Sequence, residues 1–420
     1  MYIAIIGSGP SAFYAAQALS NNDNNKVDII EKLFAPYGLV RYGVAPDHQK
    51  TKNIIKLFNR VLEKENVNFF GNIDITEGIS LNFISDTYDA VILATGASKD
   101  KMLNIKGENI PGVYGSSQIV GWYNDDPKHV SLSPDLNTEN VVIIGNGNVA
   151  LDCARILAKD QKELEGSDIS SSTLKRLSSS KIKNIYIFGR RGPKEAKFTI
   201  SELREFKELE NFSIKVNFSR ELIETYINDD SIDTRIKKNL EIFNEFYDIK
   251  NKNKNIIFDF FKSPVEIIGD QFNKKVKIIN SNKDTTIINT NLIIKAIGYR
   301  SSSINNLKMD ESNNFLLSNN GYIEKNIYAT GWAANNSVGV IGTNKARSLD
   351  VVKKIESEIV SSKNNSTDKL IEELKRKNIN FISKKDWESL DHLEEKNAMS
   401  NFIREKFRTT DEALKALKQT

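Results

Sequence analysis

The chain has 420 residues, of which 39% are hydrophobic and 27% are charged, values typical of a globular protein with two or three domains. A single cysteine, Cys153, excludes an internal disulfide, a CxxC redox pair and a thiolate-bound metal cluster. Three histidines argue against a histidine-rich metal centre. The net charge of +4 is too balanced to indicate nucleic-acid binding.

The chain contains no apolar run of about 18 residues, so we expect no membrane span. Residues 2–6 already have the pattern of a buried strand, and a glycine turn follows at once, which leaves no room for a leader before it. We therefore expect a cytoplasmic protein, or a mitochondrial one if a transit peptide has been removed.

Strand and helix patterns alternate over the first 105 residues. We expect strands over residues 2–6, 27–30, 67–70 and 90–94, and helices over about 11–20 and 51–64. Short apolar strands that alternate with helices predict a parallel sheet covered on both faces.

The same pattern begins again in the middle of the chain. A strand over 140–144, a glycine turn, a helix over 148–159 and strands over 185–188 and 292–295 predict a second α/β unit. The charged segment 222–254 has a helical pattern, and the tail after Thr367 predicts surface helices. Together these patterns predict two dinucleotide-binding, Rossmann-like domains with parallel central sheets.

The first glycine turn, residues 7–12, follows a G-x-G-x-x-A pattern. Gly7 permits the tight turn, and Gly9 lets the backbone approach a pyrophosphate at the start of the next helix. Glu31 ends the second strand, where a carboxylate accepts hydrogen bonds from a ribose. The alternative is a plain tight turn. The strand before the turn, the helix after it and the acid Glu31 together disfavour this alternative.

The second glycine turn, Gly145 to Ala150, lacks such an acid. The next strand instead ends in Arg190 and Arg191, and guanidinium groups bind the 2′-phosphate of NADP through paired donors. The alternative is a solvated basic turn. We therefore expect NADP at this turn.

These motifs resemble one family, the adrenodoxin reductase type of ferredoxin–NADP reductase. The resemblance depends on the signature segment 36–48 (PYGLVRYGVAPDH), on residues 145–152 and 189–193, and on 263–267 and 331–341. The tail around Asp386 and Trp387 also has a counterpart in the family. The likeness covers essentially the whole chain and implies a layout like that of glutathione reductase.

The resemblance implies an FAD-binding domain over 1–98 and 297–420 and an NADP-binding domain over 99–296. It places FAD against Gly7, Gly9, Ser11, Glu31, Leu39, Ile75, Trp332, Gly339, Val340 and Ile341. It places NADP against Asn146, Gly147, Asn148, Val149, Arg190, Arg191 and Glu202, with Gly339 near the nicotinamide. For Trp332, the alternative is ordinary core packing.

The resemblance also implies that His48 and Asp152 are the catalytic residues and lie near the contact between flavin and nicotinamide. For His48, the alternative is a loop histidine that caps the following helix. For Asp152, the alternative is an acid that favours the helix N-terminus electrostatically. We interpret Cys153 as a small buried residue.

The implied reaction passes a hydride from NADPH to FAD and then single electrons to a ferredoxin- or adrenodoxin-type iron–sulfur protein. An acidic ferredoxin would dock on Arg204, Arg235, Lys237 and Lys238, and we expect a monomer. The alternatives are an FAD- and NADPH-dependent monooxygenase and an electron-input subunit of a larger complex.

Overall fold

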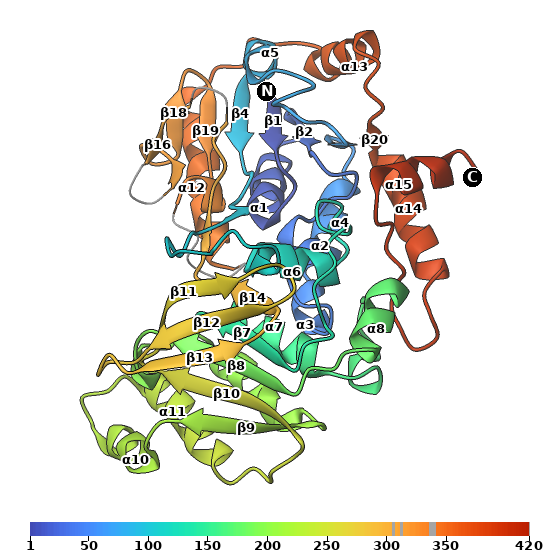
Figure 1. The fold of residues 1–420 in the computed structure, drawn as a ribbon. Coiled ribbons are helices and arrows are strands. Elements are labelled where there is room, and N and C mark those ends of the chain that lie inside the picture. The colour runs from blue at the N-terminus through green and yellow to red at the C-terminus, as the bar shows by residue number, and fades with distance from the viewer. Residues whose placement is uncertain (305–306, 311–313, 336–341, 420) are drawn as a thin grey trace. The chain divides into compact units, whose positions relative to one another are not determined.

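A computed structural model describes residues 1–304, 307–310, 314–335 and 342–419 (Figure 1). The chain forms two compact units. The first comprises Met1–Lys99, Asn124–Val130 and Tyr299–Thr420, and the second comprises Asp100–Tyr123 and Ser131–Gly298. The chain crosses between the units at the short strand β5 (Lys99–Asp100), on either side of Asn124–Val130, and just before the short strand β15 (Tyr299–Arg300).

The first unit is built on a sheet whose described strands follow the order β18-β19-β4-β1-β2-β3-β20. The five central strands are parallel, and the edge strands β18 and β20 run antiparallel to their neighbours. The strands are β1 (Tyr2–Ile6), β2 (Lys26–Ile30), β3 (Val67–Gly71), β4 (Ala90–Leu93), β18 (Tyr322–Glu324), β19 (Ile327–Ala329) and β20 (Ile382–Ser383), with β16 (Met309–Asp310) and β17 (Phe315–Leu316) paired separately.

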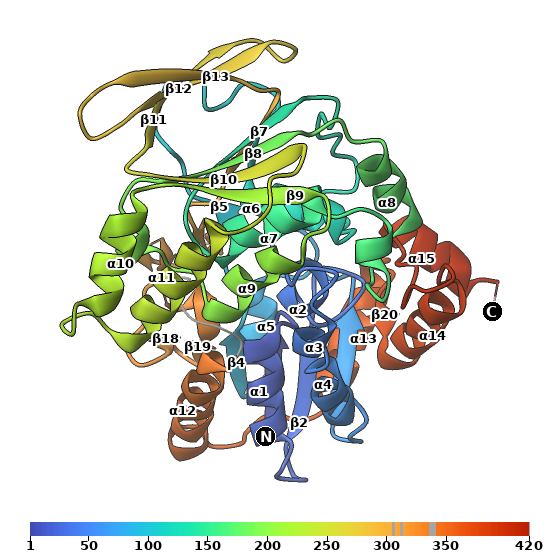
Figure 2. The same ribbon diagram turned by 90° about the horizontal axis from the view of Figure 1, so that it is seen from below.

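Both faces of this sheet are buried, as the short apolar strands predict. In β1, Ile3 and Ile5 pack into one core beneath α1, α4 and α12, whereas Ala4 and Ile6 pack into another beneath α5 and α13 (Figures 1 and 2). The helices are α1 (Pro10–Leu19), α2 (Leu39–Tyr42), α3 (Gln49–Lys52), α4 (Ile55–Leu62), α5 (Leu81–Thr87), α12 (Thr343–Glu358), α13 (Ser366–Arg376), α14 (Lys384–Lys396) and α15 (Thr410–Leu417).

The second unit is built on a fully parallel sheet in the order β6-β14-β7-β8-β10-β9. An antiparallel sheet, β11-β12-β13, packs on one of its faces through Ile267, Val276 and Ile278. The strands are β6 (Val113–Gly115), β7 (Asn140–Ile144), β8 (Asn184–Gly189), β9 (Phe212–Asn217), β10 (Lys254–Phe260), β11 (Ser263–Gly269), β12 (Lys274–Ile279), β13 (Thr285–Asn289) and β14 (Leu292–Lys295).

Helices cover the other face of that sheet, where α7 packs on β7 and α11 packs on β9 (Figure 2). They are α6 (Ser116–Tyr123), α7 (Asn148–Ala158), α8 (Ser171–Ser178), α9 (Ile200–Arg204), α10 (Arg220–Asn228) and α11 (Thr234–Phe246). The predicted α/β class with two parallel sheets is confirmed. Among the described residues, no helix is long and apolar enough to cross a membrane.

Two local predictions were wrong in detail. The single helix expected over 51–64 is two helices, because i→i−3 bonds such as Lys56 N to Asn53 O (3.1 Å) close a turn between α3 and α4. The helical segment expected over 222–254 is split between α10 and α11. The tail forms surface helices as predicted, and α14 buries one face through Trp387, Leu390 and Glu394.

Candidate functional site

The carboxyl ends of β1, β2, β4 and β19 meet at one edge of the first unit's sheet. Gly7 N donates to Ile30 O (2.8 Å), Ala94 N to Ile6 O (2.8 Å) and Thr330 N to Leu93 O (3.0 Å). Ligands of open α/β sheets bind at such an edge, outside the carboxyl ends of the strands. The first glycine turn lies there, between β1 and α1.

The two glycines of this turn have different roles. Gly7 has φ +99°, and a Cβ at this position would lie 2.6 Å from Ala94 O, so no other residue fits. A Cβ at Gly9 would meet nothing within 4 Å. Gly9 is also the N-cap of α1 and provides no side-chain cap, so the first N–H groups of the helix face an open cradle. The cradle fits a pyrophosphate.

Glu31 lies at the end of β2, as predicted, and its carboxylate reaches the glycine turn. Oε2 accepts hydrogen bonds from Ser8 N (2.8 Å) and Ser8 Oγ (2.6 Å), and Oε1 accepts one from Leu33 N (3.0 Å). The carboxylate is therefore held in a fixed orientation beside the turn. Sequence reasoning missed Ser8, which is fully buried.

The structure brings two of the remaining residues expected at the flavin, Ser11 and Trp332, to the same edge. Ser11 is the second residue of α1, and its Oγ would lie 2.1 Å from a Cβ at Gly331. Trp332 follows Gly331 after the end of β19. The indole Nε1 of Trp332 is buried and has no hydrogen-bond partner among the described residues, which fits a ligand acceptor.

The other expected flavin contacts differ in exposure. Leu39 is 42% exposed at the start of α2, whereas Ile75 is buried in the core beneath α5 and α13. Three predicted residues, Gly339, Val340 and Ile341, lie outside the described part of the chain.

The second glycine turn repeats this geometry in the second unit. Gly145 has φ +137°, and a Cβ there would lie 2.1 Å from Ala296 O at the end of β14. A Cβ at Gly147 would meet nothing within 4 Å, and Gly147 caps α7 without a side-chain bond. The predicted helix start at Asn148 is confirmed, and Asn148 Oδ1 accepts a hydrogen bond from Thr199 N (2.8 Å).

Two further features of this turn fit a phosphorylated nucleotide. Asn146 Oδ1 is buried without a partner among the described residues. Arg190 and Arg191 follow β8 with exposed side chains, and within the described chain neither forms an ion pair. Two unneutralised guanidinium groups at a strand end are suited to bind a phosphate dianion.

Asp152 and Glu202 are brought together by a residue that sequence reasoning missed, the fully buried Arg155. Its Nη2 lies 2.9 Å from Asp152 Oδ1, and its Nη1 lies 3.5 Å from Glu202 Oε2 and 3.1 Å from Glu205 Oε2. The spacing of Asp152 and Arg155 at i, i+3 on one helix could have indicated the first of these contacts.

The structure shows the surroundings of two further residues that the sequence singled out, His48 and Cys153. His48 is the N-cap residue of α3, but its side chain makes no capping bond. Cys153 is fully buried, and burial raises the pKa of its thiol well above the usual range. The prediction that Cys153 is a small buried residue is confirmed.

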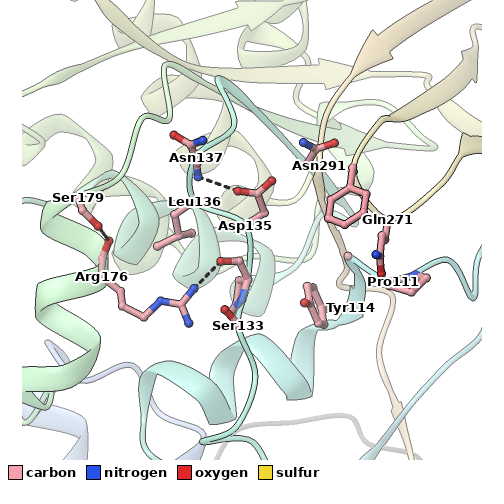
Figure 3. Close-up of a pocket in the computed structure, with 13 residues that line it drawn as sticks. Pro111, Tyr114, Ser133, Asp135, Leu136, Asn137, Arg176, Ser179, Gln271 and Asn291 are labelled. Atoms are coloured by element: carbon pink, nitrogen blue, oxygen red, sulfur yellow. Dashed lines mark hydrogen bonds between the residues drawn. The ribbon is translucent and has the colours of Figure 1, made fainter.

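A cavity of about 610 Å³ lies at the opposite end of the second unit's sheet (Figure 3). Gly112, Asn137 and Asn291, which precede β6, β7 and β14, line it. Asp135 and Arg176 are its charged lining residues, and Arg176 donates to Pro134 O (2.7 Å) and Leu132 O (3.3 Å) and so holds the loop before β7. This cavity is separate from the glycine turn.

Comparisons with known proteins agree with this geometry. Residues 1–189 match the family described as pyridine nucleotide-disulphide oxidoreductase. The chain is 34% identical to the NADPH-ferredoxin reductase FprA of Mycobacterium leprae, over 94% of this chain and 93% of the relative. It is 33% identical to the mitochondrial NADPH:adrenodoxin oxidoreductase of Arabidopsis thaliana, over 99% and 95%.

A solved structure agrees as well. Mycobacterium tuberculosis FprA in complex with NADPH matches with a TM-score of 0.91 at 33% identity, over 99% of each chain. The fold and the two glycine turns thus define a two-domain pyridine-nucleotide oxidoreductase. More narrowly, the chain belongs to the family of NADPH–ferredoxin and NADPH:adrenodoxin reductases.

The glycine geometry predicts opposite outcomes for two neighbouring substitutions. Gly145→Ala places a methyl group against a backbone carbonyl at positive φ and is expected to destabilise the protein by about 2 kcal/mol or more. Gly147→Ala meets open space and is expected to change stability by less than about 0.5 kcal/mol. Urea unfolding of both variants measures the difference. Equal stabilities would contradict the close approach of β14.

Proposed function

We propose that the chain is an FAD-containing NADPH–ferredoxin reductase. The observation that carries this proposal is a pair of open glycine cradles, of which only the second is followed by two exposed, unneutralised arginines. One cradle then suits FAD and the other suits NADP. The names of the relatives, NADPH-ferredoxin reductase and NADPH:adrenodoxin oxidoreductase, support the same reaction.

FAD, when bound, accepts a hydride from NADPH and returns electrons singly to an iron–sulfur protein. We assign FAD to residues 1–98 and 297–420 and NADP to residues 99–296. In the first, Gly7 and Gly9 admit the pyrophosphate and Glu31 orients the ribose. The rest of the FAD site is assigned to Ser11, Leu39, Ile75 and Trp332.

In the NADP site, Asn146 to Val149 present the helix start to the pyrophosphate, and Arg190 and Arg191 bind the 2′-phosphate. Glu202 and Asp152 are placed beside the nicotinamide, and Arg155 holds both carboxylates in orientation. His48 is assigned a polar role at the flavin. All these assignments are proposals from the family pattern.

The electron acceptor is proposed to be a ferredoxin- or adrenodoxin-type iron–sulfur protein that docks on α9 and α11. These helices pack together and carry Arg204, Arg235, Lys237 and Lys238. Lys237 lies 3.4 Å from Asp230, whereas Arg235 and Lys238 are exposed. The monomeric state and the cytoplasmic or mitochondrial location stay predictions.

The visible spectrum of the purified protein tests the class directly. We expect flavin bands that NADPH bleaches under anaerobic conditions and that oxidised ferredoxin restores, because electrons then leave the flavin for the partner. A protein without bound flavin would contradict the proposal. Rapid oxygen consumption without ferredoxin would instead indicate the monooxygenase alternative.

Replacing both Arg190 and Arg191 with glutamine tests the 2′-phosphate assignment. Loss of charge-assisted hydrogen bonds worth about 1.5–3 kcal/mol is expected to raise the KM for NADPH about 10- to 100-fold. The KM for NADH, which lacks the phosphate, is expected to change little. Steady-state kinetics with a small dye as acceptor measures both, and equal effects on both nucleotides would contradict the assignment.

Replacing Arg235 and Lys238 with glutamine tests the docking face. At low salt, kcat/KM for ferredoxin is expected to fall by about 3- to 10-fold and to become less sensitive to ionic strength. The matched control replaces Lys275 and Lys277 of β12, on the other face of the parallel sheet, and is expected to leave ferredoxin reduction unchanged. An equal loss in both double variants would contradict a specific face.

A further inference from the structure

The signature segment 36–48 forms a wall of the first glycine turn. Tyr37 N donates to Ser8 O (3.0 Å). Gly38 has φ +50°, and a Cβ there would lie 2.9 Å from Gly9 Cα. The segment therefore touches both inner residues of the turn, and a shift of the segment would change the shape of the cradle.

The other side of the segment is held by the C-terminal part of the chain. Trp387 Nε1 donates to Tyr37 Oη (3.1 Å), and Tyr37 Oη donates to Asn59 Oδ1 (2.5 Å). Tyr37 has φ +82°, a conformation that non-glycine residues adopt only when their surroundings hold them. The hydroxyl contacts of Tyr37 supply that restraint.

A buried ion pair makes a second attachment. Arg41 is 2% exposed, its Nη2 lies 2.5 Å from Glu394 Oε1, and its guanidinium lies 5.1 Å from the ring centre of Trp387. Glu394 is fully buried and also accepts hydrogen bonds from Phe407 N (2.9 Å) and Arg404 Nη1 (3.2 Å). One carboxylate thus connects the signature segment to the end of the chain.

The sequence explains why one helix makes both attachments. Ser383 and Asp386 form a capping box that fixes the start of α14. From there, Trp387, Leu390 and Glu394 follow the i, i+3, i+7 spacing of one helix face, and all three are buried.

We propose that residues 384–407, which we call the C-terminal brace, position the signature segment against the glycine turn and thereby set the affinity for FAD. Trp387 and Glu394 are positioning residues in this scheme. A cradle that is already ordered spares FAD the cost of ordering it on binding. The inference builds on the proposed function, because it takes FAD as the ligand of the first turn.

Two substitutions that share one hydrogen bond test the brace. Tyr37→Phe and Trp387→Phe both remove the bond between these two side chains. Tyr37→Phe also removes the bond to Asn59, and Trp387→Phe also alters the ring contact with Arg41, so each is expected to raise the dissociation constant for FAD at least about fivefold. The rise in free-flavin fluorescence on dilution of the holoprotein measures this constant. Because the bond between Trp387 and Tyr37 is lost in both variants, their effects on FAD affinity are expected to be less than multiplicative in the double variant.

Tyr88→Phe is the matched control. It removes another buried tyrosine contact of the first unit, from Tyr88 Oη to Asp28 Oδ2 (2.6 Å), on the other face of the sheet. It is expected to lower the melting temperature about as much as Tyr37→Phe while leaving the FAD dissociation constant unchanged. An FAD constant that stays unchanged in the Tyr37 and Trp387 variants, or rises equally in the control, would overturn the brace.

Hydrogen exchange gives a readout that is independent of flavin loss. In Glu394→Gln, amides of the signature segment are expected to exchange faster than in the wild type, while those of β1 and β2 stay protected. Uniformly faster exchange throughout the first unit would overturn a local role. A wild-type protein that binds no FAD at all would contradict the proposed function instead, so the two failures are distinguishable.

Discussion

The arrangement of each unit depends on one close approach between backbones. At Gly7, the backbone carbonyl of Ala94, just after β4, occupies the space that a Cβ would need. At Gly145, the carbonyl of Ala296, just after β14, does the same. A bulkier residue would push that strand end away and open the sheet edge at which nucleotides bind. Soon after each of these alanines, the chain leaves one unit for the other. The same contact therefore shapes the cradle and fixes the point from which the chain crosses.

The two cradles differ in the charge that surrounds them, and this difference separates their ligands. In the first, Glu31 is locked by three donors, which suits neutral hydroxyl groups. In the second, cations are divided between two environments. Arg155 is fully buried against three carboxylates, whereas Arg190 and Arg191 are exposed and unneutralised within the described chain. The buried Arg155 holds the carboxylates of the site in place, and the exposed Arg190 and Arg191 are available to bind a phosphate.

Local patterns predicted both glycine turns and the central parallel strands β1, β2, β3, β4, β7, β8 and β14, because a short buried strand followed by a turn can be recognised within about ten residues. The strands β9, β10, β12 and β13 were not predicted. Strands β1, β7 and β14 have the predicted bounds. The features that were missed depend on distant partners. Arg41 and Glu394 are separated by 353 positions, and no local sequence pattern around either residue indicates that the two form a pair. Likewise, the lysine-rich alternation of β12 resembles a solvated segment until Val276 and Ile278 are seen against the parallel sheet.

The discontinuity of the first unit has a consequence for biosynthesis. The strand β19 and the helices α12 and α14 that complete this unit are translated after the whole of the second unit. During synthesis, β4 leaves the ribosome with the edge that later pairs with β19 still uncovered, while residues 131–298 can already fold together. The turn is complete only once Glu394 has emerged and reached Arg41. The first unit, whose N-terminal strands are synthesised first, is therefore the last to complete its packing.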